Sequence, residues 1–336
     1  MKTVESTVGY GPSRTGRSAA VLPWVLRAGA ALLLLVVVLG HVAAENAVVL
    51  VAVTPVAGWL LVLAVPLTVV AVLRRQRVEA AIAVVLCLAH VTWLAGAYCT
   101  SGPQEAPGAT ATVRLLSANL KAGNSAVTSV ARKLRDSGAD VLSLQEVTPE
   151  HLARLRKAGL PGTYPYSVID ALPGFHGSAI FSKLPLTAAR AFDVDGSPMT
   201  TATITRGGRT VRIVAVHAVA PLSGTNRTRW RAQLASLRTM LPAENSATVL
   251  IGDFNATLDH RSLADLTEAG WRDAFTEAGE GFGFTYPNGW GPVMPMLRLD
   301  HAMVSEPLTV LRAETGDNPG SDHRMLAVDI AVPAAS

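Results

Sequence analysis

Three long aliphatic stretches occupy the first hundred residues of the chain. They cover about residues 21–44, 47–73 and 80–98, and the second has no charged residue, although it contains Pro55 and Pro66. As helices, stretches of this length can each cross a hydrocarbon core of about 30 Å, and a membrane helix tolerates proline. A cleaved signal peptide would explain one such stretch but not three. The pattern predicts three transmembrane helices within residues 21–99.

Positive charges next to these stretches predict how they are oriented. The polar tail at residues 1–20, which we expect to be disordered, contains Lys2, Arg14 and Arg17, and Arg27 follows at the helix entry. The connection at residues 74–77 contains three arginines, whereas residues 41–46 contain no Lys or Arg. Because Lys and Arg stay on the cytoplasmic side, we expect a multi-pass cell-membrane protein. Its N-terminus should be cytoplasmic and the residues after the third helix extracytoplasmic.

After a linker at residues 100–111, short apolar runs alternate with amphipathic segments. The runs predict strands, and the amphipathic segments predict helices. Expected strands cover residues 113–118, 141–144, 178–182, 200–205, 210–217, 249–251, 296–304 and 325–332, and expected helices cover 127–137, 149–158, 227–241 and 262–269. Most strand pairs joined by short turns look antiparallel. The order predicts an α/β domain over residues 112–333, in which helices cover two sheets.

Charge narrows the choice of partner for this domain. The whole chain has a net charge of +4, a pI of about 9.3 and a mean hydropathy of +0.33. Most of the excess belongs to the membrane part, since residues 112–336 contain 22 Lys and Arg against 21 Asp and Glu. A nearly neutral domain has no electrostatic footprint for a long polyanion.

One stretch, Val249-Leu250-Ile251-Gly252-Asp253-Phe254-Asn255-Ala256-Thr257, combines a buried strand with two polar side chains. Spacing of i and i+2 near a strand end turns Asp253 and Asn255 to the same side. A carboxylate can take a proton from water, and an amide can donate a hydrogen bond to an oxyanion. The stretch alone fits either a hydrolytic site or a solvated turn, since Gly, Asp and Asn are common in turns.

Similar polar groups follow most of the other predicted strands. They are Asn119, Glu146, His217, Asp253 with Asn255, Asp300, and Asp322 with His323. All are residue types that bind a hard cation or transfer protons. Core packing does not explain such a series, which favours the hydrolytic site.

The order and local sequences of these motifs resemble those of the endonuclease/exonuclease/phosphatase superfamily. The matching segments are SANL, DVLSLQEV, HGSAIFSKLPL, VAVHA, LIGDFNAT, RLDHAMVS and GSDHRMLAVDI, spread over about residues 112–333. That superfamily includes DNase I-like nucleases, abasic-site endonucleases, inositol-polyphosphate 5-phosphatases and neutral sphingomyelinases. The resemblance implies a four-layer α/β sandwich of two mainly antiparallel sheets flanked by helices, here preceded by three transmembrane helices. It also implies phosphoester hydrolysis that depends on Mg²⁺ or Mn²⁺.

The resemblance also implies a role for each polar residue. Glu146 would be the main metal ligand, supported by Asn119 and Asp322. Asp253 would orient and deprotonate the attacking water, with Asn255 donating to a phosphate oxygen. His323 would stabilise charge on the phosphoryl group, Asp300 would hold the tautomer of that histidine, and His217 would be a second histidine beside the phosphate.

Some positions depart from the pattern or remain open. Lys121 stands where some nucleases of the family have Asp, which puts a second metal ion in doubt. Arg227, Arg229 and Arg231 fit either phosphate contacts or a solvated helix start. Trp271, Trp290 and Tyr286 fit either a pocket wall or packing.

The sequence therefore predicts a membrane-anchored, metal-dependent phosphoesterase acting by in-line attack of an activated water. Its partners would be a phosphoester substrate and the lipid bilayer, and no protein partner is predicted. The substrate stays open between nucleic acid, phospholipid and a small phosphodiester. One alternative is a catalytically silent scaffold on a membrane anchor. Another is a small transporter with a soluble appendage, which the lack of paired intramembrane charges disfavours.

Overall fold

The computed structural model describes residues 15–42, 45–98, 104–106, 109–241, 247–279 and 281–334. They divide into two compact units, one within residues 1–42 and 57–93 and the other within 43–56 and 94–336. The predicted disordered tail lies outside the described residues up to position 14, but residues 15–20 are helical. Half of the predicted linker, residues 100–103 and 107–108, also lies outside them, and residues 109–111 belong to a strand.

Helices make up the N-terminal part of the chain. They are α1 (Thr15–Val42), α2 (Val48–Leu60), a 3-10 turn at Leu61–Leu63, α3 (Ala64–Leu73) and α4 (Arg77–Tyr98). Among the described residues, Val48–Leu73 and Arg77–Ala95 are long and apolar enough to cross a membrane. The first predicted span, residues 21–44, overlaps α1, whose apolar part among the described residues, Pro23–Leu39, is shorter than such a span. Residues 43 and 44 lie outside the described residues. Two candidate spans are therefore found where three were predicted.

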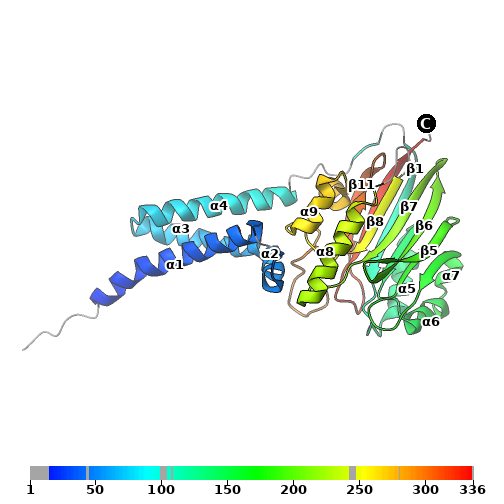
Figure 1. The fold of residues 1–336 in the computed structure, drawn as a ribbon, viewed down its shortest axis with the longest axis horizontal. Helices are drawn as coiled ribbons and strands as arrows, with labels where there is room; N and C mark the ends of the chain where they lie inside the picture. The colour runs from blue at the N-terminus through cyan, green and yellow to red at the C-terminus, as the bar shows by residue number, and fades with distance from the viewer. Residues whose placement is uncertain are drawn as a thin grey trace, which may run out of the picture. The chain divides into compact units, whose positions relative to one another are not determined.

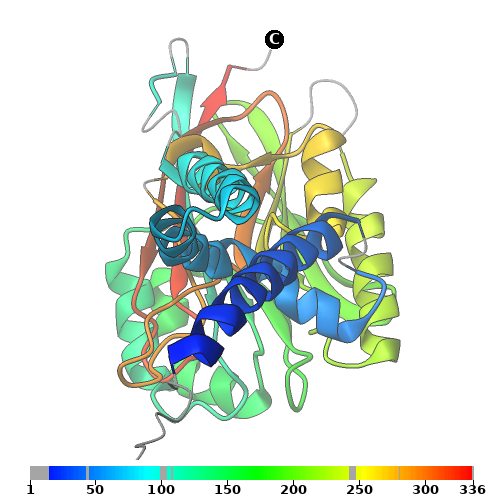
Figure 2. The ribbon, with the colours of Figure 1, turned by 90° about the vertical axis from the view of Figure 1, so that its left-hand side faces the viewer.

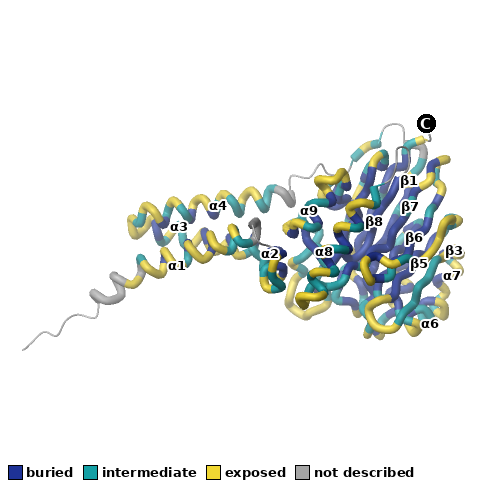
Figure 3. Tube along the Cα trace, in the orientation of Figure 1, coloured by how far each residue is buried: buried dark blue, intermediate teal, exposed yellow. Residues whose placement is uncertain are grey.

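The exposure of large apolar side chains on these helices is unusual for a water-soluble protein. Leu63, Val69, Val85 and Leu88 are each more than half exposed, and Leu73 is 76% exposed, so much of α3 and α4 is coloured as exposed in Figure 3. Contiguous exposed apolar surface of this kind marks an interaction with another molecule or with lipid.

The second unit is built on two six-stranded sheets (Figure 1). The first sheet has the order β11 (Thr309–Gly316), β12 (Met325–Pro333), β1 (Ala109–Asn119), β2 (Val141–Gln145), β4 (Ser178–Ser182) and β3 (Tyr166–Asp170). The second has the order β5 (Thr187–Val194), β6 (Ser197–Arg206), β7 (Arg209–His217), β8 (Ala247–Asp253), β10 (Asp300–Val304) and β9 (Arg272–Asp273). The pairs β1–β2 and β7–β8 are parallel, so each sheet is mixed and mainly antiparallel.

Three apolar clusters in this unit define its layers. Alternate residues of a strand face opposite sides of the sheet, so Leu115 of β1 and Ile213 of β7 meet in the cluster between the sheets. Leu116 faces outward to α5 (Val127–Asp136), α6 (Pro149–Lys157) and α7 (Leu160–Thr163). Val214 faces outward to α8 (Gly224–Arg238) and α9 (Arg261–Glu268).

The layers therefore run helix, sheet, sheet, helix, as the sequence predicted. Figure 2 shows α5 and α6 on one side of the sheets and α8 and α9 on the other. The short helix α10 (Ala274–Ala278) contributes to the cluster between the sheets.

Four strands were not predicted, namely β3, β5, β9 and β11. β3 and β5 lie at the edges of their sheets, and most residues of β5 are exposed. An exposed edge strand buries neither face fully, so its sequence lacks the apolar run or alternation that identifies a strand. The strand predicted to start at residue 296 starts at Asp300 instead.

Candidate active site

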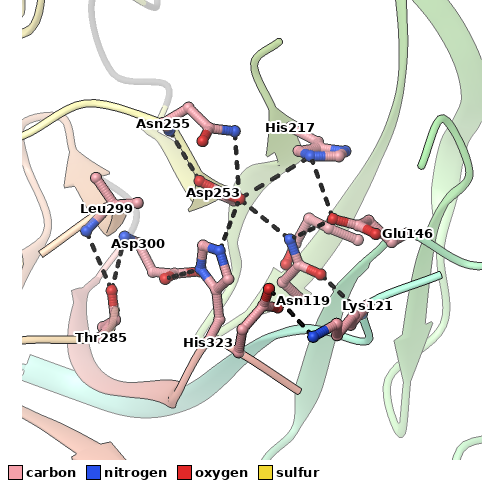
Figure 4. Close-up of polar contacts among 12 residues, drawn as sticks. Asn119, Lys121, Glu146, His217, Asp253, Asn255, Thr285, Leu299, Asp300 and His323 are labelled. Carbon is pink, nitrogen blue, oxygen red and sulfur yellow. Dashed lines mark hydrogen bonds and ion pairs between the residues drawn. The ribbon is translucent and has the colours of Figure 1, made fainter. Parts of the chain in front are cut away.

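Strand register brings the predicted site residues to one edge of the sandwich. Asn119 at the end of β1 pairs with Gln145 at the end of β2, directly before Glu146. In the second sheet, Asp253 of β8 pairs with His217 on one side and with Asp300 on the other. Carboxyl ends of adjacent parallel strands share an edge, so both sheets deliver polar side chains to the same place (Figure 4).

Asn119 links the two sheets at the centre of the site. Its Nδ2 donates to Glu146 Oε1 at 3.0 Å and to Asp253 Oδ2 at 3.1 Å. Its Oδ1 accepts from the backbone N–H of Lys121 at 2.9 Å. An amide nitrogen between two carboxylates can only donate, so Asn119 holds Glu146 and Asp253 within reach of one ligand.

Glu146 stands in an unusual backbone conformation. Its φ of 56° lies in the left-handed region, as do those of Lys121 (57°) and Asn255 (47°). A residue with a β-carbon is strained there, and such strain clusters at functional sites. The Glu146 carboxylate also accepts from the Ala122 N–H at 2.8 Å, so it faces the site in a defined orientation.

Asp253 is almost fully buried, with 1% of its surface exposed. Its Oδ1 accepts from the Asn255 backbone N–H at 2.8 Å, while the Asn255 side chain donates to the Ala218 carbonyl at 2.8 Å. Burial raises the pKa of Asp253, and Asp300 raises it further, against the opposing effect of His323 and His217. A carboxylate whose pKa is raised is a better proton acceptor at neutral pH.

The ring of His323 lies between two carboxylates. Its Nδ1 is 2.8 Å from Asp300 Oδ2 and its Nε2 is 3.6 Å from Asp253 Oδ2. Burial alone would lower the pKa of His323, but Asp300 and Asp253 outweigh burial and raise it to about 10. The ring is therefore an imidazolium at neutral pH.

Asp253, Asp300 and His323 bring three potential ligand atoms within 4.8 Å of one another. We nevertheless assign no metal ion to this group. The two nitrogens of the His323 ring already face carboxylates, with Nδ1 2.8 Å from Asp300 Oδ2 and Nε2 3.6 Å from Asp253 Oδ2, whereas metal ligation would need a free ring nitrogen.

His217 and Asp322 complete the predicted set. His217 Nε2 lies 4.0 Å from Glu146 Oε1 and 3.9 Å from Asp253 Oδ2, so this ring also faces both carboxylates. The Asp322 carboxylate is 3.4 Å from Lys121 Nζ. Lys121, noted in the sequence only as a departure from the family pattern, thus places a cation at the site.

Other side chains of the site were not assigned from the sequence. The Tyr286 ring lies 5.1 Å from the His323 ring, and Trp290 lies 5.6 Å from Tyr286 in an edge contact. Trp290 is 51% exposed, whereas Trp271 is buried in the core. Ser321 and Asn318 both donate to the Asn119 carbonyl. The sequence left Tyr286, Trp290 and Trp271 open between a pocket wall and packing. Single Ser and Asn residues in loops have no distinctive spacing, so the sequence offered no signal for Ser321 and Asn318.

Gly252 explains how closely the two sheets approach behind the site. A β-carbon on Gly252 would lie 2.0 Å from the Val216 carbonyl oxygen and 2.9 Å from Gln145 Nε2, and its φ is 151°. Gln145 in turn donates to Ser143, which donates to the Ile251 carbonyl of the opposite sheet. The glycine therefore permits a polar link between the sheets one residue from Asp253.

The three arginines of α8 contact other parts of the fold and not the residues of the site. Arg227 donates to the Glu45 carbonyl, Arg229 to the Gly196 carbonyl, and Arg231 pairs with the Glu45 carboxylate. His301, beside Asp300, is buried and contacts Asp273 at 2.8 Å.

Comparison with known proteins supports the resemblance to the endonuclease/exonuclease/phosphatase family. A model of the endonuclease/exonuclease/phosphatase family matches residues 116–323, more than half of the chain. A search of curated protein sequences gave no match.

Solved structures with the same fold include an endonuclease/exonuclease/phosphatase from Beutenbergia cavernae. It has 18% identity and a TM-score of 0.55, with 67% of this chain and 72% of that one covered. Another is truncated TDP2 from Caenorhabditis elegans, with 19% identity, a TM-score of 0.54, and 66% and 98% covered. At these identities the likeness shows the fold alone. Together with the family match, it establishes that the chain belongs to the endonuclease/exonuclease/phosphatase family of phosphoester hydrolases.

Proposed function

We propose that the chain is a membrane-anchored, metal-dependent phosphoesterase that hydrolyses a phosphodiester or phosphomonoester by in-line attack of water. One observation carries the proposal. A buried carboxylate with a raised pKa, Asp253, lies 3.6 Å from the imidazolium of His323 and shares the Asn119 amide with Glu146. A base and a cation this close together can both reach one phosphoryl group, the base through the attacking water and the cation through a phosphoryl oxygen.

Asp253 would accept the proton of the attacking water. The backbone N–H of Asn255 fixes Oδ1, which leaves Oδ2 toward the centre of the site. His323 would donate from Nε2 to a phosphoryl oxygen, since Asp300 holds Nδ1 at 2.8 Å. A fixed cation aimed at charge that develops in the transition state is a major source of rate acceleration.

The residues fit a divalent cation on the Glu146 side of the site. Glu146 and Asp253 are two carboxylates that share a single amide donor, and Asp253 is desolvated. Mg²⁺ and Mn²⁺ prefer such hard oxygen ligands, and a cation would offset the cost of the buried charge. Glu146 and Asp322 would hold it, with Asn119 as support. When bound, it would polarise the phosphoryl oxygens and favour a nucleophilic water.

Two features support anchoring in a membrane. Val48–Leu73 and Arg77–Ala95 are long and apolar enough to span a membrane, and many of their large aliphatic side chains, such as Val69, Leu73 and Leu88, are exposed. Together with the arginines at residues 74–77, they favour a catalytic domain outside the cytoplasm.

The surroundings of His323 favour an amphipathic phosphoester over a long nucleic acid. Tyr286 and the exposed Trp290 extend from the His323 ring as an apolar surface, and the domain is almost neutral. Polyanion binding relies on clustered Lys and Arg, whereas an apolar group next to the phosphate can pack on aromatic rings.

A silent scaffold is the less favoured alternative. Left-handed backbone at Glu146 and Asn255 and a buried, raised-pKa carboxylate at Asp253 each cost stability. In a domain without catalytic activity, nothing would offset the stability lost at Glu146, Asn255 and Asp253.

The test is an activity panel on the full chain in detergent, with Mg²⁺, Mn²⁺ or EDTA. Bis-p-nitrophenyl phosphate, sphingomyelin, inositol phosphates, plasmid DNA and RNA represent the substrate classes. Metal-dependent turnover that is highest on amphipathic or small esters supports the proposal. No turnover of any ester with either metal argues for the scaffold.

A further inference from the structure

The segment that precedes and begins α2 belongs to the catalytic unit. Residues 43–56 group with residues 94–336, although in sequence they include the start of the second apolar stretch, at residues 47–73. Glu45, in this segment, is only 7% exposed. A carboxylate is rarely buried unless it is paired, so its partners indicate what the segment does.

Glu45 caps a helix that is remote in sequence. Its carboxylate accepts from the backbone N–H of Ser262 at 2.7 Å and from the Ser262 hydroxyl. Ser262 is the second residue of α9, and the N-cap residue of that helix makes no side-chain cap of its own. The first N–H groups of a helix have no partner within it and attract negative charge. Glu45 supplies that charge from 217 residues away.

Two further bonds join the segment to the same region. The Glu45 carbonyl accepts from Arg227 of α8 at 2.9 Å, and Arg231 Nε lies 3.5 Å from the carboxylate. Val51 is 4% exposed and belongs to the same buried cluster as Trp230 and Phe254. The segment is thus packed and hydrogen-bonded over several residues.

His260 connects the segment to the turn that carries Asp253 and Asn255. The backbone N–H of Thr257 donates to His260 Nδ1 at 2.9 Å, so Nδ1 is the acceptor and Nε2 carries the proton. Nε2 lies 2.9 Å from the Val51 carbonyl, to which it donates. The His260 ring therefore bridges residue 51 and a residue four positions after Asp253.

Trp230 holds the same turn from α8. Its indole N–H donates to the Phe254 carbonyl at 3.1 Å, and its ring makes an edge contact with His260. Asn255 between these attachments has a strained φ of 47°. Strained backbone persists only where its surroundings determine it.

We propose that residues 45–51 brace the active-site turn, with Glu45 fixing the start of α9 and His260 acting as the positioning residue for Asp253 and Asn255. The connection between the first two apolar helices is then a working part of the catalytic domain. It follows that this connection and the domain lie on the same side of the bilayer. The activity readout below rests on the proposed function, whereas the cross-linking and exchange readouts do not.

Cross-linking tests the docking in the full chain. With Cys87 and Cys99 replaced by Ser, Glu45→Cys with Ser262→Cys should form a disulfide under mild oxidation. Glu45→Cys with Glu268→Cys, six residues further along the same helix, is the matched control and should remain reduced. Failure of the first pair, or equal cross-linking of both, overturns the docking.

Hydrogen exchange tests the bracing independently of activity. Glu45→Ala and His260→Ala should speed amide exchange at residues 254–257, whereas Leu160→Ala, which opens the core on the opposite face of the sandwich, should not. His260→Asn keeps an acceptor for Thr257 and should restore part of the protection. If Leu160→Ala speeds exchange at these residues as much, the effect is general destabilisation and the brace is refuted.

Turnover supplies the functional readout. Glu45→Ala and His260→Ala should lower kcat about 10- to 100-fold, because a displacement of about 1 Å at catalytic groups costs this much, while KM stays nearly constant. If the disulfide forms and Glu45→Ala and His260→Ala speed amide exchange, but kcat in these variants is unchanged, then the segment docks on the turn without positioning the catalytic groups. An inactive wild type that still passes the first two tests would count against the proposed function and not against the brace.

Discussion

Asp300 and His323 form the shortest contact among the charged groups of the site, with 2.8 Å between Oδ2 and Nδ1. The other nitrogen of the ring faces Asp253. Asp300 therefore sets both the orientation and the charge of the ring that faces Asp253, the proposed base. Its second oxygen, Oδ1, is buried and has no hydrogen-bond partner among the described residues, so its charge is balanced mainly through His323.

This pairing predicts how stability depends on pH in the metal-free protein. The folded pKa of about 10 lies above the ordinary value of 6.5, so the charged ring adds stability that is complete below about pH 6.5 and is lost as pH rises toward 10. In EDTA, the Tm should fall between pH 7 and 10. His323→Gln removes the titrating group and should flatten this slope. Equal slopes in the two proteins would show that the ring is not charged.

Asp300→Asn should move the pH dependence of turnover. Without the Asp300 charge the pKa of His323 falls, since Asp300 is the largest of the effects that raise it. The rate should then decline at a lower pH than in the wild type, with the alkaline side of the kcat profile shifted toward neutrality. An unshifted alkaline limb together with a lower rate would assign Asp300 a purely structural role.

Glu146→Gln should weaken metal binding while the fold remains intact. The amide keeps the shape of the side chain and loses its charge, and hard cations need carboxylate oxygen. Calorimetry with Mn²⁺ should show a loss of affinity of at least about tenfold. Glu150→Gln, an exposed carboxylate paired only with Arg154, is the control and should bind like the wild type. Unchanged affinity in Glu146→Gln removes this residue from the metal site.

Gly252→Ala should destabilise the sandwich behind Asp253. The new β-carbon would meet the Val216 carbonyl oxygen at 2.0 Å, and no flexible side chain can yield there. We expect a loss of more than about 2 kcal/mol, or roughly 4–8 °C in Tm. Gly123→Ala, where nothing lies within 4 Å, should leave Tm nearly unchanged. Tolerance of Ala at position 252 would mean that the backbone of β8 lies further from β7 at this residue than described.

Reporter fusions test the predicted orientation. Alkaline phosphatase fused after Ser336 should be active, because the enzyme folds outside the cytoplasm, and a cytosolic fluorescent reporter at the same position should be dark. Replacing Arg74, Arg75 and Arg77 by Gln should weaken the preference for an orientation with residues 74–77 in the cytoplasm. A fluorescent reporter with inactive phosphatase would contradict both the orientation and an extracytoplasmic site.

Strong local patterns made most of the sandwich predictable. Strands such as β7 and β8 have most residues on both faces buried. The helices that connect strands have clear caps or apolar faces. Edge strand β5 has neither signal. For α1, composition predicted a span over residues 21–44, but the apolar part of the described helix is only Pro23–Leu39.

The site could be predicted as a set of residues but not as a geometry. Residue type and position at strand ends identified Glu146, Asp253 and His323, because the chemistry limits which side chains can serve. Which of them meet depends on register and on bonds between distant segments. The Asn119 bridge between two sheets and the Tyr286–His323 contact have no local signature, and neither does the cap of α9 by Glu45.

The most direct measurement is kcat for the wild type, Asp253→Asn, His323→Ala and the double variant on one phosphoester that the wild type hydrolyses with Mg²⁺ or Mn²⁺. Loss of the base should cost about 10²–10⁴-fold and loss of the charged donor about 10²–10³-fold, with no large fall in Tm. Because both groups act on one phosphoryl group, the double variant should lose less than the product of the single losses. Single variants that keep near wild-type turnover would contradict the account.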